Sequence, residues 1–182
     1  MNFKTLSLSV LTTLATVATP VVAGYQYQGV SLMDGSDFKG NEVLAGDMIN
    51  SLNNLGIPVI DGGKEKLETC EPGENSYVMG FYVPSSNLMV ICTNTTPTDE
   101  QFEVLTHEVV HVIQDARLGI DNDELGETDN RTHYQLANNL SEDKVYTITE
   151  LYPEEDWVVE TEAFFYQDKP QVVANELRRW AF

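Results

Sequence analysis

THEVVHVIQD, which runs from Thr106 to Asp115, is the stretch on which the interpretation of this chain depends. It holds two of the three histidines of the sequence, His107 and His111, with Glu108 beside the first. In an α-helix, side chains four positions apart lie on one face, about 6 Å from each other. Two imidazoles placed in this way can share one metal ion. Glu108, offset by about 100° from His107, then flanks the ion rather than binding it.

The surrounding residues predict a buried helix from Pro97 to Leu118. Threonine, proline and two acidic residues in the segment 96–100 are typical of a helix start, and Gly119 is typical of a helix end. Within the predicted helix the apolar side chains form one continuous stripe: Phe102, Leu105, Val109, Val112 and Ala116. Buried histidines are costly unless they are hydrogen-bonded or bound to metal. The alternative of two hydrogen-bonded core histidines beside a solvated glutamate stays open.

Zinc is the metal that this pattern favours. Zinc binds neutral imidazole nitrogens, and in catalytic sites it takes three protein ligands and leaves a fourth position for water. A glutamate beside the ion can accept the proton of that water. The pattern is the HExxH arrangement of metallopeptidases, so Glu108 is the candidate general base and His107 and His111 are candidate ligands of a zinc ion (Zn2+).

A third ligand must come from elsewhere in the chain. Gln114 and Arg117 stand where metzincins have a glycine and a third histidine, so that class is excluded. The segment 151–170 predicts a second helix, with an acidic first turn and an apolar middle that contains Glu160 and Glu162. A carboxylate in such surroundings must be paired, protonated or metal-bound. Both glutamates are candidates at this point.

THEVVHVIQ followed at a distance by VETEAFF resembles the gluzincin group of zinc metallopeptidases, in which a glutamate on a later helix completes the HExxH site. In several such families, including the ImmA/IrrE and HtpX types, this ligand is the first residue of E-x-x-A followed by Asp or Asn. The resemblance therefore implies Glu160 as the ligand, with Ala163 three positions later and Glu162 as the rival. Phe164 departs from the pattern, so the hydrogen bond of a polar residue to a metal-bound histidine is missing or supplied elsewhere.

The same resemblance implies a zinc-dependent peptidase with a peptide or protein substrate. It also implies a histidine or tyrosine that stabilises the oxyanion of the tetrahedral intermediate; the candidates are His133, Tyr134, Tyr146 and Tyr152. His133, in a short polar stretch, is in addition a rival metal ligand. No anchor for a free amine is recognisable, which favours an endopeptidase.

The chain begins with a segment typical of a secretory signal peptide. Met1 to Ala23 contains Lys4, an apolar stretch and a small-residue cleavage site, and the apolar stretch is too short to span a membrane. We therefore expect a single mature domain, residues 24–182, that is secreted or periplasmic. In an exported protein Cys70 and Cys92 most simply form one disulfide bond, with two free thiols as the alternative.

The charge of the chain limits its partners. With 10 basic and 29 acidic residues the formal net charge is −19. Binding to nucleic acid or anionic membranes needs clustered lysine and arginine, so neither partner is expected. No second membrane segment is predicted, and the sequence does not indicate an oligomeric state. The charge favours neutral or basic peptides as substrates.

The remaining patterns predict a small α+β domain, and the gluzincin resemblance implies that it is of the zincin type, with a short antiparallel sheet or hairpin packed against the HExxH helix. Glu42–Leu55 should form a helix with Val43, Leu44, Met48, Ile49 and Leu52 inward, and Ile57–Ile60 a strand near a sheet edge. We further expect a hairpin of Tyr77–Val83 and Leu88–Thr93, a short helix near Arg131–Leu140, a strand at Val145–Thr149, and a final helix, Pro170–Ala181, that buries Val172, Val173, Leu177 and Trp180.

These observations predict an exported zinc peptidase in which Glu108 is the general base and His107, His111 and Glu160 hold the metal. The first alternative is a non-catalytic exported metal-binding or cell-envelope binding module. The second is a structural domain without metal. A zinc hydrolase that acts on another amide, such as a peptidoglycan cross-link, is a further possibility among enzymes.

Overall fold

Three short strands form a sheet in the order β3-β5-β4: β3 is Val59–Asp61, β5 is Leu88–Ile91 and β4 is Gly80–Val83. The computed structural model describes residues 18–21, 24–27, 29–73, 78–120 and 122–182. β4 and β5 are antiparallel, with Val83 opposite Leu88 across the turn 84–87, so the predicted hairpin is confirmed. β3 pairs with β5 in parallel, which corrects the expectation of an antiparallel sheet. β3 lies at an edge, as Pro58 predicted.

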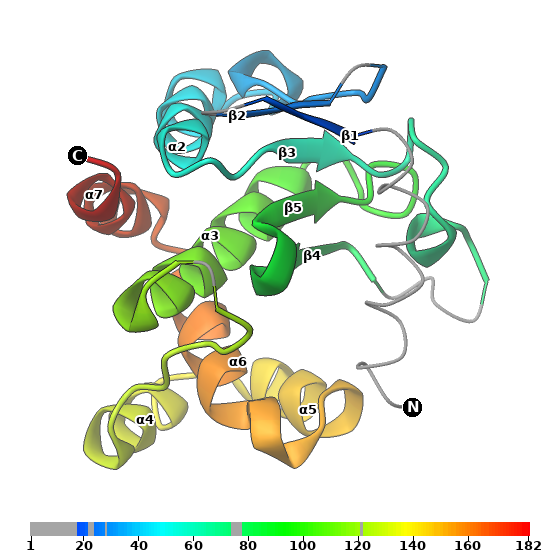
Figure 1. Cartoon of the computed structure of the whole chain (residues 1–182). Helices are drawn as coiled ribbons and strands as arrows, with labels where there is room; N and C mark the ends of the chain where they lie inside the picture. The colour runs from blue at the N-terminus through cyan, green and yellow to red at the C-terminus, as the bar shows by residue number, and fades with distance from the viewer. Residues whose placement is uncertain (1–17, 22–23, 28, 74–77, 121) are drawn as a thin grey trace.

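Helix α3, Gln101–Leu118, lies at the centre of the molecule (Figure 1). The sheet contacts it on one side, and the helices α6, Trp157–Tyr166, and α7, Pro170–Ala181, pack on other sides. The predicted apolar stripe of α3 is buried, and the helix ends before Gly119, whose φ of 95° favours glycine. α3 begins at Gln101, so the predicted helix was four residues too long at its start. A helix surrounded in this way places its polar side chains inside the protein.

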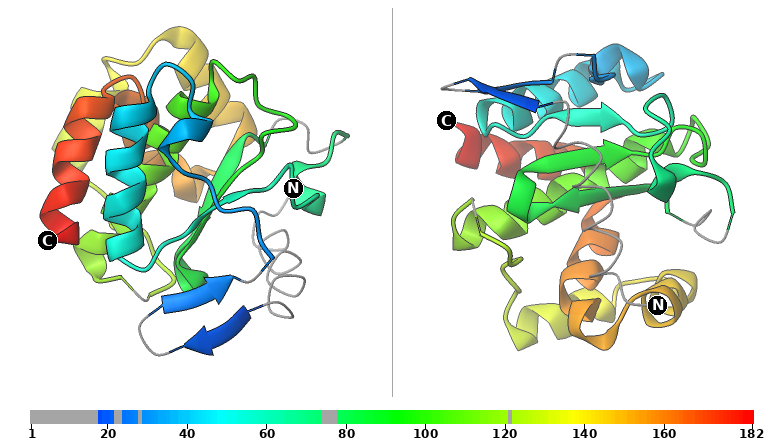
Figure 2. Two further views of the ribbon diagram at one scale, coloured as in Figure 1. Left: turned by 90° about the horizontal axis from the view of Figure 1, so that it is seen from above. Right: turned by 45° about the vertical axis from the view of Figure 1, so that its right-hand side comes forward.

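α2, Glu42–Asn54, and α7 lie side by side (Figure 2), and both share a hydrophobic core with α3. Both helices were predicted, but their buried faces are narrower than expected. Val43 is 83% exposed because it lies two residues from Ala45, on the opposite side of the helix from the buried stripe Ala45, Met48, Ile49 and Leu52. Val172 and Trp180 of α7 are also exposed, whereas Val173 and Leu177 are buried as predicted.

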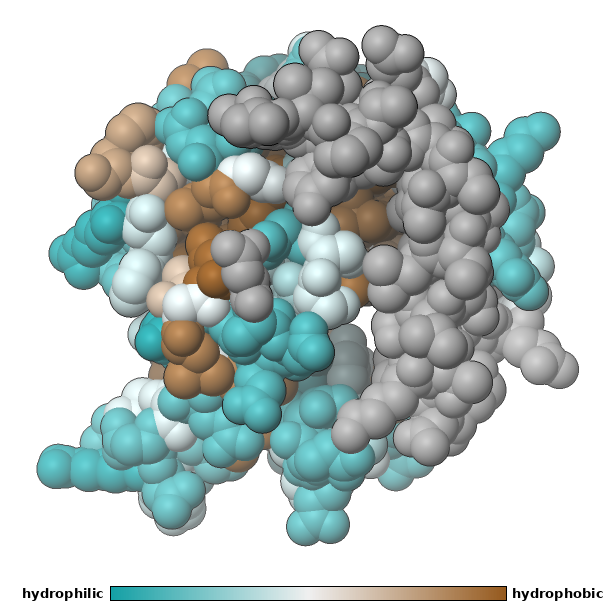
Figure 3. Space-filling view, viewed as in Figure 1, coloured by the Kyte–Doolittle hydropathy of each residue, from teal (hydrophilic) through white to brown (hydrophobic). Residues whose placement is uncertain are grey.

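The helices α4, Asn130–Ala137, and α5, Glu142–Leu151, lie with α6 on the opposite side of α3 from α2 (Figure 1). The strand predicted at Val145–Thr149 is therefore wrong. Its β-branched residues favoured a strand, but Ser141 caps the helix by accepting a hydrogen bond from the Lys144 N–H, and an acidic first turn follows. On the face shown in Figure 3, hydrophilic side chains cover most of the region of α4 and α5.

α6 is shorter than the second helix that the sequence predicted. Pro153 precedes a turn of 3-10 helix, Glu154–Asp156, and the α-helix begins at Trp157. Its middle residues, including Glu160 and Glu162, are buried. A helix of 10 residues with two buried glutamates needs cationic or hydrogen-bonding partners for both.

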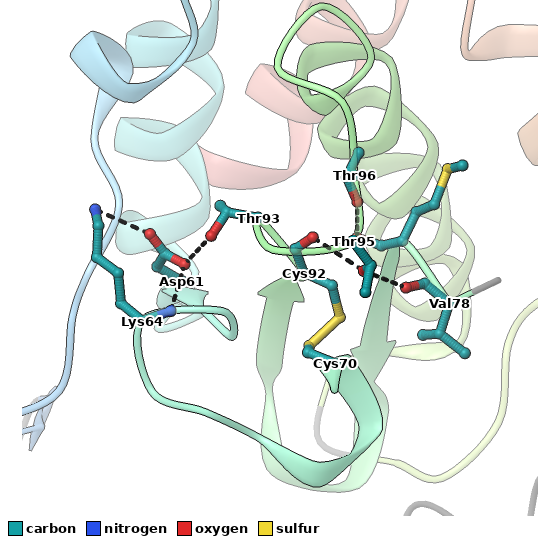
Figure 4. Close-up of a disulfide and its surroundings, with 9 residues drawn as sticks. Asp61, Lys64, Cys70, Val78, Cys92, Thr93, Thr95 and Thr96 are labelled. Carbon is teal, nitrogen blue, oxygen red and sulfur yellow. Dashed lines mark hydrogen bonds and ion pairs between the residues drawn. A yellow bond between two sulfur atoms is a disulfide. The ribbon is translucent and has the colours of Figure 1, made fainter. Parts of the chain in front are cut away.

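Cys70 and Cys92 form a disulfide bond, as predicted, with their Cα atoms 5.0 Å apart (Figure 4). The bond joins the loop before β4 to the residue after β5. Nearby, the Thr95 hydroxyl donates to the Val78 carbonyl and the Thr96 hydroxyl to the Met79 carbonyl, each over 3.0 Å. These bonds attach the chain that enters β4 to the segment that leads into α3.

The described residues form one α+β domain with six α-helices and the three-stranded sheet. A separate two-stranded hairpin pairs β1, Ala18–Val21, with β2, Gly24–Tyr27. Apart from β1, the predicted signal peptide, residues 1–23, lies outside the described residues. None of the described helices is long and apolar enough to cross a lipid bilayer.

Candidate metal centre

Three buried side chains from two helices converge in the middle of the molecule. His107 and His111 lie one turn apart on α3, and Glu160 comes from α6, which packs against α3. The two Nε2 atoms are 3.2 Å apart, and the Glu160 carboxylate lies 3.2 Å from His107 Nε2 and 3.4 Å from His111 Nε2. All three residues are less than 10% exposed. We call these residues the His-His-Glu cluster.

The spacing of the His-His-Glu cluster fits a tetrahedral metal ion. Two ligand atoms at about 2.05 Å from zinc, in tetrahedral geometry, lie about 3.3 Å from each other. The two Nε2 atoms are 3.2 Å apart, and the distances from them to the carboxylate are 3.2 Å from His107 to Glu160 Oε2 and 3.4 Å from His111 to Glu160 Oε1. Glu160 Oε2 is buried and accepts no hydrogen bond from the described residues, although such an atom is costly to bury without a partner. The donor set, the spacing and this oxygen all suit a small divalent cation.

The structure distinguishes Glu160 from Glu162, which the sequence left as alternative candidates for the third metal ligand. Glu162 points to the other side of α6, where its two oxygens each accept a hydrogen bond of 2.7 Å from Arg117. Beside it, Gln114 Nε2 donates to Glu162 over 3.2 Å. Because of this ion pair, the pKa of Arg117 is raised above its ordinary value. The carboxylate of Glu162 is therefore paired with Arg117, away from the His-His-Glu cluster. This pairing offsets the cost of burying its charge.

His133 lies apart from the cluster. It is on α4, and it is not among the residues that line the cleft around His107 and His111. Among the groups of potential ligand residues in the described chain, only His107, His111 and Glu160 place their ligand atoms within 4.8 Å of one another. The structure thus brings together the three residues that the sequence proposed as metal ligands.

Burial dominates the electrostatics of the cluster. It raises the pKa of Glu160 to about 7, against the opposing effect of His111 and of a hydrogen bond from the Tyr152 hydroxyl. Burial likewise raises the pKa of Glu108 to about 7, although His107 and a hydrogen bond from the backbone N–H of Tyr82 lower it. Burial lowers the pKa of His111, which favours the neutral imidazole that metals bind. For both carboxyl groups, burial thus outweighs the favourable charge of the neighbouring histidine.

Each histidine of the cluster contacts a glutamine through its second ring nitrogen. His107 Nδ1 lies 2.9 Å from Gln167 Oε1, and His111 Nδ1 lies 2.8 Å from Gln114 Oε1. Phe164, which replaces the expected polar residue, packs its ring edge-on against His107 with the ring centres 4.8 Å apart. The hydrogen bond to His107 that Phe164 does not provide is thus supplied by Gln167, one helical turn later.

Sequence reasoning missed both glutamines, although their positions carried a signal. Gln114 is three residues after His111 and therefore lies on the same face of α3. Gln167 is seven residues after Glu160, two helical turns along α6. A search for polar residues at helical spacing from the proposed ligands would have found them.

A cleft of about 960 Å³ opens over the cluster. Its floor is the face of α3 that carries Val104, His107, Glu108 and His111. One side, which we call the sheet wall, is formed by residues 78–85 of β4 and its flanks. The other side, the helical wall, is formed by the lining residues between Thr147 and Gln167. The volume of the cleft suits a segment of several residues of an extended peptide.

β4 passes close over α3. A Cβ atom at Gly80 would lie 2.6 Å from Val104 Cγ1 and 3.4 Å from Glu108 Cγ, so glycine permits this approach. Two residues later, the Tyr82 N–H donates to the Glu108 carboxylate. β4 is also an edge of the sheet. The sheet wall therefore holds the candidate base through its backbone and presents an edge strand of the described sheet to the cleft.

Of the four candidates for an oxyanion donor, Tyr152 lines the cleft. Its hydroxyl donates to the Glu160 carboxylate, and its pKa is raised well above the ordinary value by burial and then by the negative charges of Glu160 and Glu108. Tyr134 and Tyr146 are 70% and 66% exposed, and neither they nor His133 line the cleft. Tyr152 is therefore a protonated hydroxyl beside the cluster.

Comparison with known proteins gives a family but no characterised relative. No curated protein and no solved structure matches this chain. One family model does match, over residues 63–182, a region that contains β4, β5, the disulfide bond and all the cleft-lining residues named above. The chain belongs to the family described as "Domain of unknown function (DUF8637)".

Proposed function

We propose that this protein is an exported zinc-dependent peptidase that cleaves within chains, an endopeptidase. The observation that carries the proposal is the His-His-Glu cluster, in which two imidazole Nε2 atoms 3.2 Å apart face a buried carboxylate whose two oxygens lie 3.2 and 3.4 Å from them, as suits a zinc ion. The buried Glu160 oxygen without a hydrogen-bond donor from the described residues supports it. The disulfide bond supports an oxidising compartment, as for a secreted or periplasmic protein.

In this proposal His107, His111 and Glu160 hold the ion, which supplies an acidified water and polarises the scissile carbonyl when bound. Glu108 accepts the proton of the water and passes it to the leaving amine. Burial raises the pKa of Glu108 to about 7 when no ion is bound, which favours uptake of a proton by this carboxylate. Tyr152 donates a hydrogen bond to the oxyanion from the helical wall, and the edge of β4 aligns the peptide.

The charge of the cleft supports neutral or basic peptides as substrates. Besides Glu108 and Glu160, the charged residues that line it are Glu100, Glu103, Asp123 and Asp156. Among the described lining residues there is no lysine or arginine. A negatively charged peptide would meet like charges along the whole cleft, which costs binding energy.

Glu108→Gln tests the proposal, because it keeps the shape of the side chain and removes the base. We expect the purified wild-type protein to contain one zinc ion and to cleave a mixed peptide library. The variant should keep the zinc and hydrolyse at least about 100-fold more slowly. Glu176→Gln, on the surface of α7, is the matched control and should behave as wild type.

The outcomes separate this proposal from its alternatives. Zinc binding without cleavage of any peptide would favour the non-catalytic metal-binding module. Absence of zinc from protein purified without chelators would favour a structural domain, and full activity in the Glu108 variant would eliminate the mechanism.

A further inference from the structure

We propose that Gln114 and Gln167 are positioning residues that hold both histidines of the His-His-Glu cluster with the proton on Nδ1, so that Nε2 is the metal-binding nitrogen in each. This inference rests on the proposed zinc site and names the residues that prepare it. Each glutamine contacts one histidine through its carbonyl oxygen, over 2.9 Å for Gln167 and 2.8 Å for Gln114.

The direction of the Gln114 amide is fixed by its other neighbours. Its NH2 group donates to the Val159 carbonyl over 2.9 Å and to the Glu162 carboxylate over 3.2 Å. A carbonyl and a carboxylate that binds Arg117 can only accept hydrogen bonds, so the amide cannot be reversed. The oxygen of Gln114 must then face His111, and an amide oxygen cannot donate. His111 Nδ1 therefore carries the proton, and its Nε2 presents a lone pair to the cluster.

The same logic applies to His107 through a different anchor. Gln167 Nε2 donates to the Glu103 carboxylate, which again only accepts. The Gln167 oxygen therefore faces His107, whose Nδ1 must carry the proton. Two lone pairs and a carboxylate then point at one position, as metal ligation requires. The fixed hydrogen bond of the second nitrogen is what orients a metal-bound histidine and sets its tautomer.

The two carboxylates that orient the glutamines, Glu162 for Gln114 and Glu103 for Gln167, differ in burial. Gln114 is fully buried between α3 and α6, and its anchor Glu162 is buried as well. Glu103 is exposed and lines the cleft together with Gln167. The arrangement of His107 can therefore be tested by substitutions near the surface, which are less disruptive to the fold than changes at Gln114.

Gln167→Met is the main test, because methionine keeps the length of the side chain and removes its hydrogen bonds. We expect zinc affinity, measured by competition with a chromogenic chelator, to fall about 10- to 100-fold. Glu103→Gln, which frees the Gln167 amide to reverse, should lower the affinity less, and Gln171→Met on α7 should leave it unchanged. Equal affinities of Gln167→Met and wild type would overturn the proposal.

NMR of the zinc-free protein provides a readout that does not depend on metal or activity. In mildly alkaline solution, where imidazole is neutral, the ring 15N shifts of wild type should show Nδ1–H in both histidines. In Gln167→Met only His107 should move toward the Nε2–H form. An Nε2–H tautomer for either histidine in wild type would refute the inference even if the protein hydrolyses peptides. If wild type shows Nδ1–H but binds no zinc, the proposed function fails and the positioning stands.

Discussion

The two walls of the cleft are held to the molecule by different means. The sheet wall lies within the loop closed by the Cys70–Cys92 disulfide, and hydrogen bonds from two threonines attach it to the start of α3. The helical wall is attached to α3 by polar side chains, above all the Arg117–Glu162 ion pair and the Gln114 amide. Within the described residues, the disulfide bond thus stabilises the sheet wall. Side-chain hydrogen bonds and an ion pair hold the helical wall, which carries Glu160 and Tyr152. Folding and metal binding should therefore be coupled mainly through the helical wall.

The largest loss of stability is expected when the attachment of the helical wall is removed. Arg117→Met leaves Glu162, which is 4% exposed, as a buried carboxylate without its cation. Breaking a buried ion pair on one side costs about 3–5 kcal/mol, and the partial exposure of Arg117 places the expectation near 3 kcal/mol. Urea unfolding of the zinc-free variant and wild type measures this loss of stability. Arg179→Met, which removes a surface pair with Glu176, should cost less than about 0.5 kcal/mol.

Removal of the disulfide bond should affect the sheet wall and leave the metal centre intact. With the two cysteines 22 residues apart, changing both to serine should lower the free energy of unfolding by about 3 kcal/mol. We expect the variant to retain its zinc, because the His-His-Glu cluster lies on α3 and α6, but to hydrolyse peptides more slowly. Loss of zinc together with the disulfide, measured by elemental analysis, would show that the two walls are not independent.

The zinc-free protein should lose stability as pH rises from about 4.5 to 7. Glu108 and Glu160 have pKa values of about 7 in the fold against an ordinary value of 4.5. The folded protein therefore binds more protons than the unfolded chain in this range, so the free energy of unfolding falls with pH, by about 2–3 kcal/mol for each of the two carboxyl groups. The difference in urea stability between wild type and the double variant Glu108→Gln, Glu160→Gln isolates this effect from other carboxylates. Equal pH profiles for the two proteins would contradict it.

Tyr152→Phe should weaken catalysis without loss of metal. Removing one donor to the oxyanion is expected to lower kcat about 10- to 100-fold, which corresponds to about 1.4–2.7 kcal/mol. Tyr146→Phe is the matched control, since that ring is exposed on α5 and outside the cleft. Kinetics on a cleaved peptide and zinc analysis of both variants provide the comparison. An unchanged kcat for Tyr152→Phe would leave the helical wall without a role beyond Glu160.

Tyr82→Phe should have the smallest effect and should alter stability only. The Tyr82 hydroxyl donates to the buried carboxylate of Asp115 over 2.6 Å, and Asn122 donates to the same group over 2.8 Å. Because Asn122 remains, we expect a loss of about 1 kcal/mol in thermal or urea unfolding. The Tyr82 N–H that contacts Glu108 is retained, so kcat should stay within about twofold of wild type. A large fall in kcat would show that the sheet wall takes part through side chains.

Much of the local structure could be predicted because it depends on local sequence patterns. The 3.6-residue period located α3 and α7, and the turn 84–87 located the hairpin. The relation between His107 and His111 follows from one helix alone. At Val145–Thr149 the prediction failed because residue type was weighed above the Ser141 cap and the acidic turn that follows it.

The parts that the sequence could not define depend on how separate elements meet. Glu160 and Glu162 lie on nearly opposite sides of α6, and the choice between them requires the rotation of α6 against α3. The parallel pairing of β3 with β5 is a contact between distant segments with no signal in either strand. The contact of Gln167 with His107 likewise appears only once α3 and α6 are packed, and so do the α6 partners that fix the direction of the Gln114 amide.

The close approach of β4 to α3 depends on the missing side chain of Gly80, and it affects the position of Glu108. An alanine there would place its methyl carbon 2.6 Å from Val104 Cγ1 and 3.0 Å from the Val90 carbonyl oxygen, so the strand would have to lift away from the helix. The Tyr82 N–H would then move off Glu108. The position of Glu108, the proposed base, beneath the cleft thus depends on the absence of a single carbon atom at residue 80.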